Sequence, residues 1–431
     1  MKTFSLVALF AISIATMVRA DLPIPAPVEV IVNTVPTDQS AIPPAESAVS
    51  AGPANQTAAE PASPLLVLED TDCPRVAKCW LRVGFDLFFI SPSRMPPLVT
   101  TGTVASGGIL GAPGATPLIA TDVNYHTLLG FTINGGVWLD CDYTWGLEGS
   151  TTWLNPRSKD YTATSNGSTL LTRPIVNALT GAPAVAVIAT PGFVAGNIVV
   201  HDRVNFETSD GHLMYNVYRD DRTSISALLG LRYLYFREST HITENQQFLT
   251  AGFGNFVGSA LPALATQTIV DEFQTFNNIL AGQMGMNFET VRDCIRISAT
   301  AKVGLGWNHE RILGSGTTSS GGVTVPGGIL AQSPSFPYRS GFDTFVVIPE
   351  LIGRVGYQIT PRLCVYASYD FLFVNNVARP GAQIDRSVNP LVVPSFQTFV
   401  GTGLAPSRPT PTFTQVDLFV HGITLGVDFK Y

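Results

Sequence analysis

The sequence predicts an all-β protein, a closed antiparallel up-and-down transmembrane β-barrel of about ten strands, in a range of roughly eight to twelve. Three observations carry this prediction. The chain begins with an export signal, and strand-length segments in which apolar and polar residues alternate follow it. The links between these segments are short and long in turn, as in outer-membrane barrels.

The first 20 residues have the features of a secretory signal peptide. Lys2 precedes an uncharged apolar run from Phe4 to Val18, and a small-residue site follows before Asp21. A membrane-spanning helix needs about 20 apolar residues, and no stretch of this chain reaches that length without charge. Any membrane span must therefore be built from strands. Because Asp21 stands where a lipoprotein needs Cys, no lipid anchor is expected.

Composition narrows the remaining possibilities. Apolar residues make up 45% and charged residues 13% of the chain, and the formal net charge is -7. An acidic chain without basic patches argues against a nucleic-acid partner, and the high apolar content argues against global disorder. Residues 21–72 are rich in Pro and Ala and predict a disordered periplasmic linker. The barrel then spans residues 73–431.

The five cysteines cannot all pair within one exported chain, because their number is odd. Cys73 and Cys79 are close enough for a small disulfide loop ahead of the first strand, and the sequence leaves this bond open. Cys141, Cys294 and Cys364 are expected to be small apolar filler.

The alternation can be counted residue by residue. From Cys294 to Asn308 the odd positions are apolar and end with Trp307, whereas the even positions include Arg296 and Lys302. Every run of this kind predicts a strand, and the predicted strands are 79–91, 125–138, 142–151, 202–219, 223–239, 270–289, 294–309, 342–358, 362–375 and 413–431.

The links between these strands fall into two classes. The short links are 140–141, 220–222, 290–293 and 360–361, and the long links are 92–124, 152–201, 240–269, 310–341 and 376–412. In outer-membrane barrels the short turns lie in the periplasm and the long loops outside, so both chain ends are expected in the periplasm.

A secreted, soluble all-β protein also alternates and is the alternative fold. The polar faces of the predicted strands combine charges with Gly, which suits a hydrated lumen better than a dry core. Aromatic residues near the strand ends are expected to form the interfacial girdles of a membrane barrel, and they are Trp145, Tyr233, Tyr235, Trp307, Tyr357 and Tyr431.

The last strand alternates from Gly422 to Tyr431 and ends in an aromatic residue, so it predicts recognition by the barrel assembly machinery of the outer membrane. Upstream, Leu418 and Val420 are in the opposite phase, and a bulge near His421 would restore the pattern. Pro349 lies within a predicted strand, where a bulge or an irregular end is expected.

Several stretches resemble the planctomycete outer-membrane β-barrel family, a porin-like family of unknown function. They are Pro96–Gly102, Gly107–Gly114, Leu228–Leu234, Gly327–Gln332 and Pro349–Asp385. The resemblance covers the chain after Cys79, with Phe88-Phe89 where the family usually has a pair of Trp. It implies an outer-membrane location and a barrel fold. It carries no established activity, so it assigns no functional residues.

No catalytic, cofactor or metal motif is found. The six histidines lack metal-ligand spacing, and there is no Walker A or G-x-S-x-G sequence. His201-Asp202 and Asp210-Gly211-His212 leave an outer-membrane hydrolase as a remote alternative, although solvated turn residues produce such pairs freely. We therefore expect a protein that is not an enzyme.

Strand parity points a mixed set of charged side chains into the lumen. They are Arg82, Asp86, Glu148, Arg232, Arg296, Lys302, Glu350, Arg354, Asp370, Asp428 and Lys430. A charge-selective pore favours one sign at its constriction, so these residues are expected to pair and fill a narrow lumen. Closure of the barrel would place Arg82 beside Asp428. The turn at 360–361 would place Glu350 opposite Asp370, either as a Ca²⁺ or proton-sharing site or, preferably, compensated by Arg354.

The sequence thus favours a narrow porin-like channel or structural barrel in the outer membrane of a Gram-negative-type bacterium. A surface adhesin or receptor-like barrel with a filled lumen is the alternative. The expected partners are the lipid bilayer and the assembly machinery, and the oligomeric state is open.

Overall fold

The computed structural model describes residues 78–119 and 122–431. The predicted signal peptide and linker lie outside the described residues. No helix in the described part of the chain is long and apolar enough to cross a membrane.

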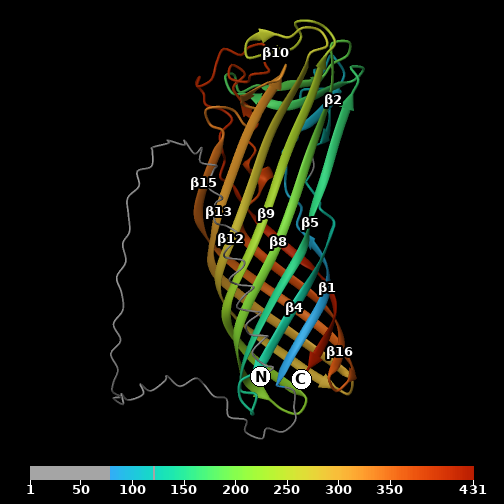
Figure 1. Cartoon of the computed structure of the whole chain (residues 1–431), viewed down its shortest axis with the longest axis vertical. Coiled ribbons are helices and arrows are strands. Elements are labelled where there is room, and N and C mark those ends of the chain that lie inside the picture. The colour runs from blue at the N-terminus through green and yellow to red at the C-terminus, as the bar shows by residue number, and fades with distance from the viewer. Residues whose placement is uncertain (1–77, 120–121) are drawn as a thin grey trace, which may run out of the picture. The chain divides into compact units, whose positions relative to one another are not determined.

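Ten antiparallel strands form a closed ring, which confirms the predicted fold class (Figure 1). Their bounds are β1 Cys79–Ile90, β4 Thr127–Trp138, β5 Trp145–Ser165, β8 Val194–Arg219, β9 Thr223–Phe248, β12 Thr266–Arg292, β13 Ile295–Ser320, β15 Tyr338–Thr360, β16 Leu363–Ala378 and β18 Gln415–Lys430. Each strand pairs with the next, and β18 pairs with β1, so that Arg82 lies opposite Asp428. The ring leaves no open edge, which a lipid environment requires.

The residues of β13 show why these segments become lipid-facing strands. Ile295, Leu305 and Trp307 are exposed on its outer face, whereas Asn308 on its inner face is fully buried. The apolar outer face runs unbroken from Ile295 to Trp307, ~40 Å along the strand and ~30 Å along the barrel axis for a tilt near 40°. That height matches the hydrocarbon core of a bilayer.

The four tight turns lie at one end of the barrel. Cys79, which begins β1, and Tyr431, the last residue, lie at the same end. Asp140 and Asp220 accept hydrogen bonds from the backbone of their own turns, at 2.8 Å from Thr144 and 2.6 Å from Thr223. Such local side-chain acceptors stabilise reversals of the chain. Tyr431 and Cys79 close the ring with two backbone hydrogen bonds, of 2.9 and 3.1 Å.

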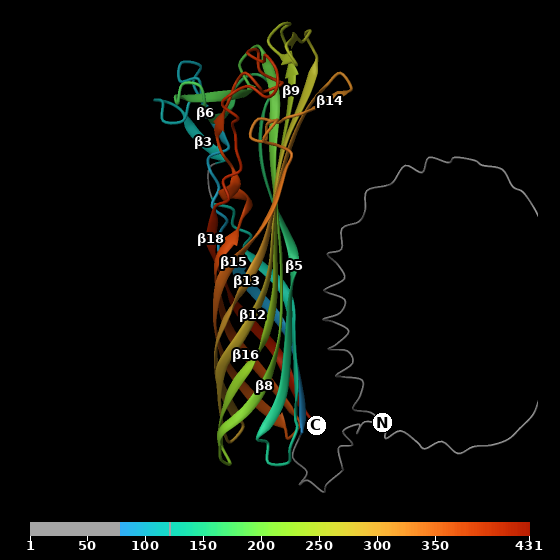
Figure 2. The same ribbon diagram turned by 90° about the vertical axis from the view of Figure 1, so that its left-hand side faces the viewer.

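The other end of the barrel differs from the prediction of long loops. β5, β8, β9, β12, β13 and β15 continue far beyond the predicted strand ends (Figure 2). A strand of 26 residues such as β8 is ~85 Å long, about twice what a tilted membrane span needs. Much of 152–201, 240–269 and 310–341 is therefore strand that rises above the membrane, and the prediction of loops there was wrong.

The links that do not extend the barrel fold into a head at this outer end. A five-stranded sheet combines β2 Val99–Gly102, β3 Thr116–Ile119, β6 Leu170–Asn177, β7 Pro183–Ala189 and β17 Ser387–Val388, while β10 Asn255–Phe256 and β11 Ser259–Ala260 form a small hairpin and β14 Val323–Pro326 pairs with β13. The five strands of the sheet share an apolar core with the upper barrel strands, which includes Val99, Ile188, Ile269 and Val388. We call this assembly the extracellular head.

Three local predictions can be compared with the structure. The ladder between β15 and β16 ends at Glu350, next to Pro349, as expected for a residue that cannot donate a ladder hydrogen bond. Cys79 is a free thiol, so the disulfide between Cys73 and Cys79, which the sequence left undecided, is not formed. Cys141 is in a disulfide, which contradicts its prediction as filler.

The predicted bulge near His421 is absent. The pairing of β18 with β1 and with β16 runs without interruption through this position. Leu418 and Val420 point inward and are buried. The change of phase therefore marks the height at which the inward side chains of this strand change from polar to apolar.

Candidate functional site

The barrel lumen is the candidate functional site, and its periplasmic part holds most of the predicted charges. The predicted pair of Arg82 and Asp428 is present at 3.4 Å, and Arg296 reaches the same carboxylate at 3.2 Å. Arg82 also lies 3.6 Å from Glu148, and Lys430 lies 4.0 Å from Glu289. Most of these side chains line a cavity of about 330 Å³ that extends to the turn at Asp220–Thr223.

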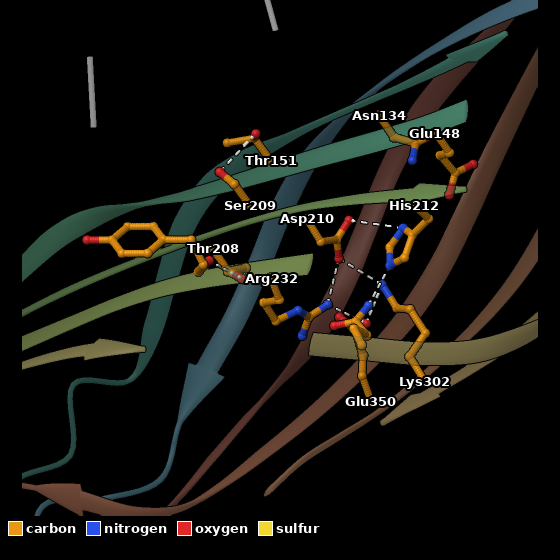
Figure 3. Close-up of polar contacts among 12 residues, drawn as sticks. Asn134, Glu148, Thr151, Thr208, Ser209, Asp210, His212, Arg232, Lys302 and Glu350 are labelled. Atoms are coloured by element: carbon orange, nitrogen blue, oxygen red, sulfur yellow. Dashed lines mark hydrogen bonds and ion pairs between the residues drawn. The ribbon is translucent and has the colours of Figure 1, made fainter. Parts of the chain in front are cut away.

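A second, tighter cluster lines the upper part of the same cavity. Asp210, Arg232, Lys302 and Glu350 converge from β8, β9, β13 and β15 (Figure 3). Arg232 donates to Asp210 at 2.7 Å and to Glu350 at 2.6 Å, and Lys302 donates to Asp210 at 2.9 Å and to Glu350. Two cations therefore balance two carboxylates. We call these four residues the charge cluster.

The register around the turn at 360–361 differs from the prediction. Glu350 pairs with Leu372, and Asp370 pairs with Ile352, because a bulge between Gln358 and Thr360 and a longer turn shift the two strands. The two carboxylates therefore do not face each other. Glu350 belongs to the charge cluster, not to a pair that Arg354 compensates.

The remaining predicted lumen residues face neighbouring hydroxyl groups or rings. Asp86 accepts hydrogen bonds from Thr132 at 2.7 Å and Thr424 at 2.8 Å, and Asp370 accepts one from Ser368 at 2.9 Å. The guanidinium of Arg354 lies 5.1 Å from the ring centre of Tyr366. Among the described residues, no group of three or more His, Cys, Asp or Glu side chains could hold a metal ion.

Above the charge cluster, most inward side chains of the lumen are apolar; the exceptions include Asn277 and Asn308, which are buried in the same rows and hydrogen-bond to each other. Inward side chains from nearly every strand of the ring pack together there with almost no exposed surface, and they include Leu128, Leu154, Val204, Phe206, Leu234, Phe236, Ile279, Val346, Ile348, Val374, Leu418 and Val420. The rings of Phe206 and Phe236 meet edge to face at 6.5 Å. We call this set the apolar plug. Ions cannot cross such a layer without losing their hydration.

The segment after β16 folds back over the apolar plug. Arg379 donates to both carboxylate oxygens of Glu238 at 2.7 Å, and both side chains are buried. Arg379 also donates to the carbonyl oxygens of Ser91 and Pro92, at 2.9 and 3.2 Å. One guanidinium thus ties this segment to β9 and to the chain after β1.

A comparison with protein-family models matches residues 80–431 to the family described as Putative beta barrel porin-7 (BBP7). The chain belongs to this porin family. It is therefore a porin-like β-barrel protein of the outer membrane of a Gram-negative-type bacterium, as the sequence predicted. The comparison with curated proteins finds no match.

Three solved structures that are similar to this porin-7 chain are distant. The outer membrane protease of Escherichia coli is 9% identical with a TM-score of 0.38, and the match covers 84% of this chain and 99% of the protease chain. A FadL homologue of Pseudomonas aeruginosa is 8% identical with a TM-score of 0.21, covering 83% and 90%. An anion-selective porin of Comamonas acidovorans is 8% identical with a TM-score of 0.17, covering 82% and 99%.

The histidine and aspartate pairs of the hydrolase alternative do not form one site. His201 points outward and Asp202 inward, on opposite faces of β8. His212 lies 3.8 Å from Asp210, whose carboxylate already accepts from Arg232 and Lys302, and its other ring nitrogen contacts Gln283 at 2.6 Å. The pair in the lumen is thus part of a balanced polar network.

Sequence reasoning missed Asp210, His212 and Glu289 as lumen residues, although the parity of their predicted strands points them inward. It also missed the apolar plug entirely. The signal was present in the last strand, where Leu418 and Val420 are out of phase with the lipid-facing residues that follow.

Proposed function

We propose that this porin-7 barrel is closed to ions and serves as a membrane anchor for its extracellular head. In this proposal the protein is a receptor-like or adhesin-like surface protein with a filled lumen, not an open channel. The observation that carries the proposal is the apolar plug, which occupies the lumen directly above the charge cluster.

The layers of the lumen support closure in two ways. An apolar constriction excludes water and ions because no polar group replaces their hydration shell. The charge cluster beneath it is internally balanced, so it offers no net charge that would draw one sign of ion inward. A conducting lumen would instead need a polar path through the plug.

The head supports a role in surface interaction. Six strands rise above the membrane-spanning part, and the links between them fold around an apolar core. Long barrel strands with ordered outer links are costly to fold, and a passive solute pore does not need them. Folded loops on a rigid scaffold commonly carry binding functions.

Planar-bilayer recording of the purified full-length barrel tests this proposal. We expect no stepwise conductance from the wild type, and we expect channels to open when Phe206 and Phe236 of the plug are both changed to Ala. The control is Phe345→Ala, which removes a ring from the lipid-facing side at a similar height and should stay silent. Regular steps of conductance from the folded wild-type protein would refute closure.

A further inference from the structure

Just above the lipid-facing belt, arginine side chains appear on the outer surface of the barrel. Tyr233, Leu280 and Trp307 pair across β9, β12 and β13 and form the last apolar row of the belt. Four residues further along the same strands, the outward row consists of Arg237, Phe276 and Arg311. That distance is ~13 Å along a strand and ~10 Å along the barrel axis.

Two arginines share one aromatic ring in this row. The guanidinium carbons of Arg237 and Arg311 lie 4.6 and 5.5 Å from the ring centre of Phe276, which holds both groups near the surface of the sheet. Arg203 on β8 and Arg339 on β15 are exposed one outward position further from the membrane. We call Arg203, Arg237, Arg311 and Arg339 the arginine collar.

The collar is not paired with acidic residues in the described part of the chain. Among the described residues, none of its four guanidinium groups forms an ion pair; Arg237 donates to the neutral amide of Gln274 at 3.1 Å. The carboxylates on this part of the outer face have other partners: Asp343 contacts His309 at 2.8 Å, Asp160 contacts His201, and Glu272 accepts from Gln274. Glu207 lies at the level of Tyr235, one row below Arg237. The four guanidinium groups are therefore not paired with the carboxylates of this face.

We propose that the arginine collar binds the phosphate groups of outer-leaflet lipids. The polar interface of a bilayer begins where the apolar belt ends, and Arg237 and Arg311 lie ~10 Å beyond the last apolar row. A guanidinium fork matches the geometry of a phosphate, and cations beside a membrane gain binding energy from anionic lipids. Lipid chains would lie on the apolar belt directly below the collar. This inference is independent of whether the lumen conducts.

Native mass spectrometry of the detergent-purified, delipidated full-length protein can test the collar. The probe is phosphatidic acid, and phosphatidylcholine of the same chain length is the reference lipid. We expect the wild type to retain phosphatidic acid preferentially. The double variant Arg237→Gln and Arg311→Gln should bind it roughly 30-fold more weakly, if each arginine near the surface contributes as membrane-adjacent cations commonly do.

Matched variants separate a defined site from general charge attraction. Arg292→Gln with Arg362→Gln removes the same charge at the periplasmic turns and should leave retention unchanged. Phe276→Leu keeps both cations but removes the ring that positions them, so it should weaken phosphatidic acid binding without abolishing it. Heat-modifiable gel migration shows that each variant is folded.

Three results would overturn the proposal. They are equal loss of lipid in the collar and turn variants, no preference for phosphatidic acid in the folded wild type, and displacement of the lipid by an equal concentration of inorganic phosphate. Inorganic phosphate lacks the chains that occupy the apolar belt, so it should compete poorly.

Discussion

Single residues of the extracellular head show how polar groups are used where water is excluded. Asp271 is buried on β12, and one of its oxygens accepts hydrogen bonds from the backbone of Ile329, Leu330 and Ala331 at 2.9–3.0 Å. Its other oxygen lies 2.8 Å from Arg173, which also lies 3.5 Å from Glu244. A Cβ at Gly328 would stand 2.2 Å from Asp271, so this loop requires glycine there. One arginine thus faces two carboxylates in the core of the head.

Glu244 should make the stability of the head depend on pH. Burial raises the pKa of the Glu244 carboxyl to about 7, and repulsion from Asp271 adds to this, whereas Arg173 lowers it. A carboxyl whose folded pKa is raised stabilises the fold below its unfolded pKa and loses that contribution as pH rises through the folded value. The head should therefore be more stable at pH 5 than at pH 8, by on the order of 2–3 kcal/mol.

Hydrogen exchange of β6, corrected for the intrinsic exchange rate, measures this effect. Glu244→Gln mimics the protonated carboxyl and should remove most of the difference between pH 5 and pH 8. The control Glu272→Gln, on the outward face of β12, should keep the wild-type dependence. A Glu244→Gln head with unchanged pH dependence would contradict the assignment.

At the scale of elements, the sequence predicted the membrane-spanning half of each strand and the four short turns. It succeeded there because lipid on one side and a polar lumen on the other impose a contrast between successive residues, as in β13 from Ile295 to Asn308. Above the membrane this contrast disappears. In β9, Ile242 and Glu244 both point inward and are buried, so alternation of polarity no longer identifies a strand.

The apolar plug escaped prediction for a related reason. Leu418 and Val420 are apolar and point inward, like residues in the core of a soluble protein. If the lumen is assumed to be polar, these two residues are assigned to the lipid-facing side, and a bulge is needed to explain their phase. The segment after β16 was missed because its contacts are made with residues far away in sequence. Arg379 meets Glu238 and Ser91, and no local pattern reports such pairs.

The segment after β16 should depend on its buried ion pair. Arg379→Met leaves the carboxylate of Glu238 buried without its cation, which commonly costs about 3–5 kcal/mol, so residues 379–393 should detach and become sensitive to protease. The comparison is Arg408→Met, which breaks an exposed pair with Asp385 and should cost less than about 1 kcal/mol. Restoration of protease resistance in Arg379→Met with Glu238→Met would show that the unpaired charge causes the defect. Equal resistance of Arg379→Met and wild type would exclude this role of the pair.

At the scale of the whole molecule, the barrel depends on one seam between its first and last strands. β1 and β18 pair over eleven positions from Trp80–Lys430 to Ile90–Val420, and Arg82 with Asp428 adds an ion pair inside this seam. Tyr431 completes it: its backbone exchanges hydrogen bonds with Cys79, and its ring is exposed at the periplasmic end. The same residue ends the alternating strand that the assembly machinery is expected to recognise.

Deletion of Tyr431 should therefore lower the amount of folded barrel in the outer membrane. The deletion removes two seam hydrogen bonds and the terminal aromatic ring together, so Tyr431→Phe serves as the control that keeps both. Heat-modifiable migration in outer-membrane fractions measures the folded protein, and we expect a clear loss for the deletion and wild-type levels for Tyr431→Phe. Tyr431→Ser separates the two causes, because it keeps the backbone bonds but not the ring. Normal levels of the deletion variant would mean that closure of the ring and recognition of its last strand both rest on the residues before Tyr431.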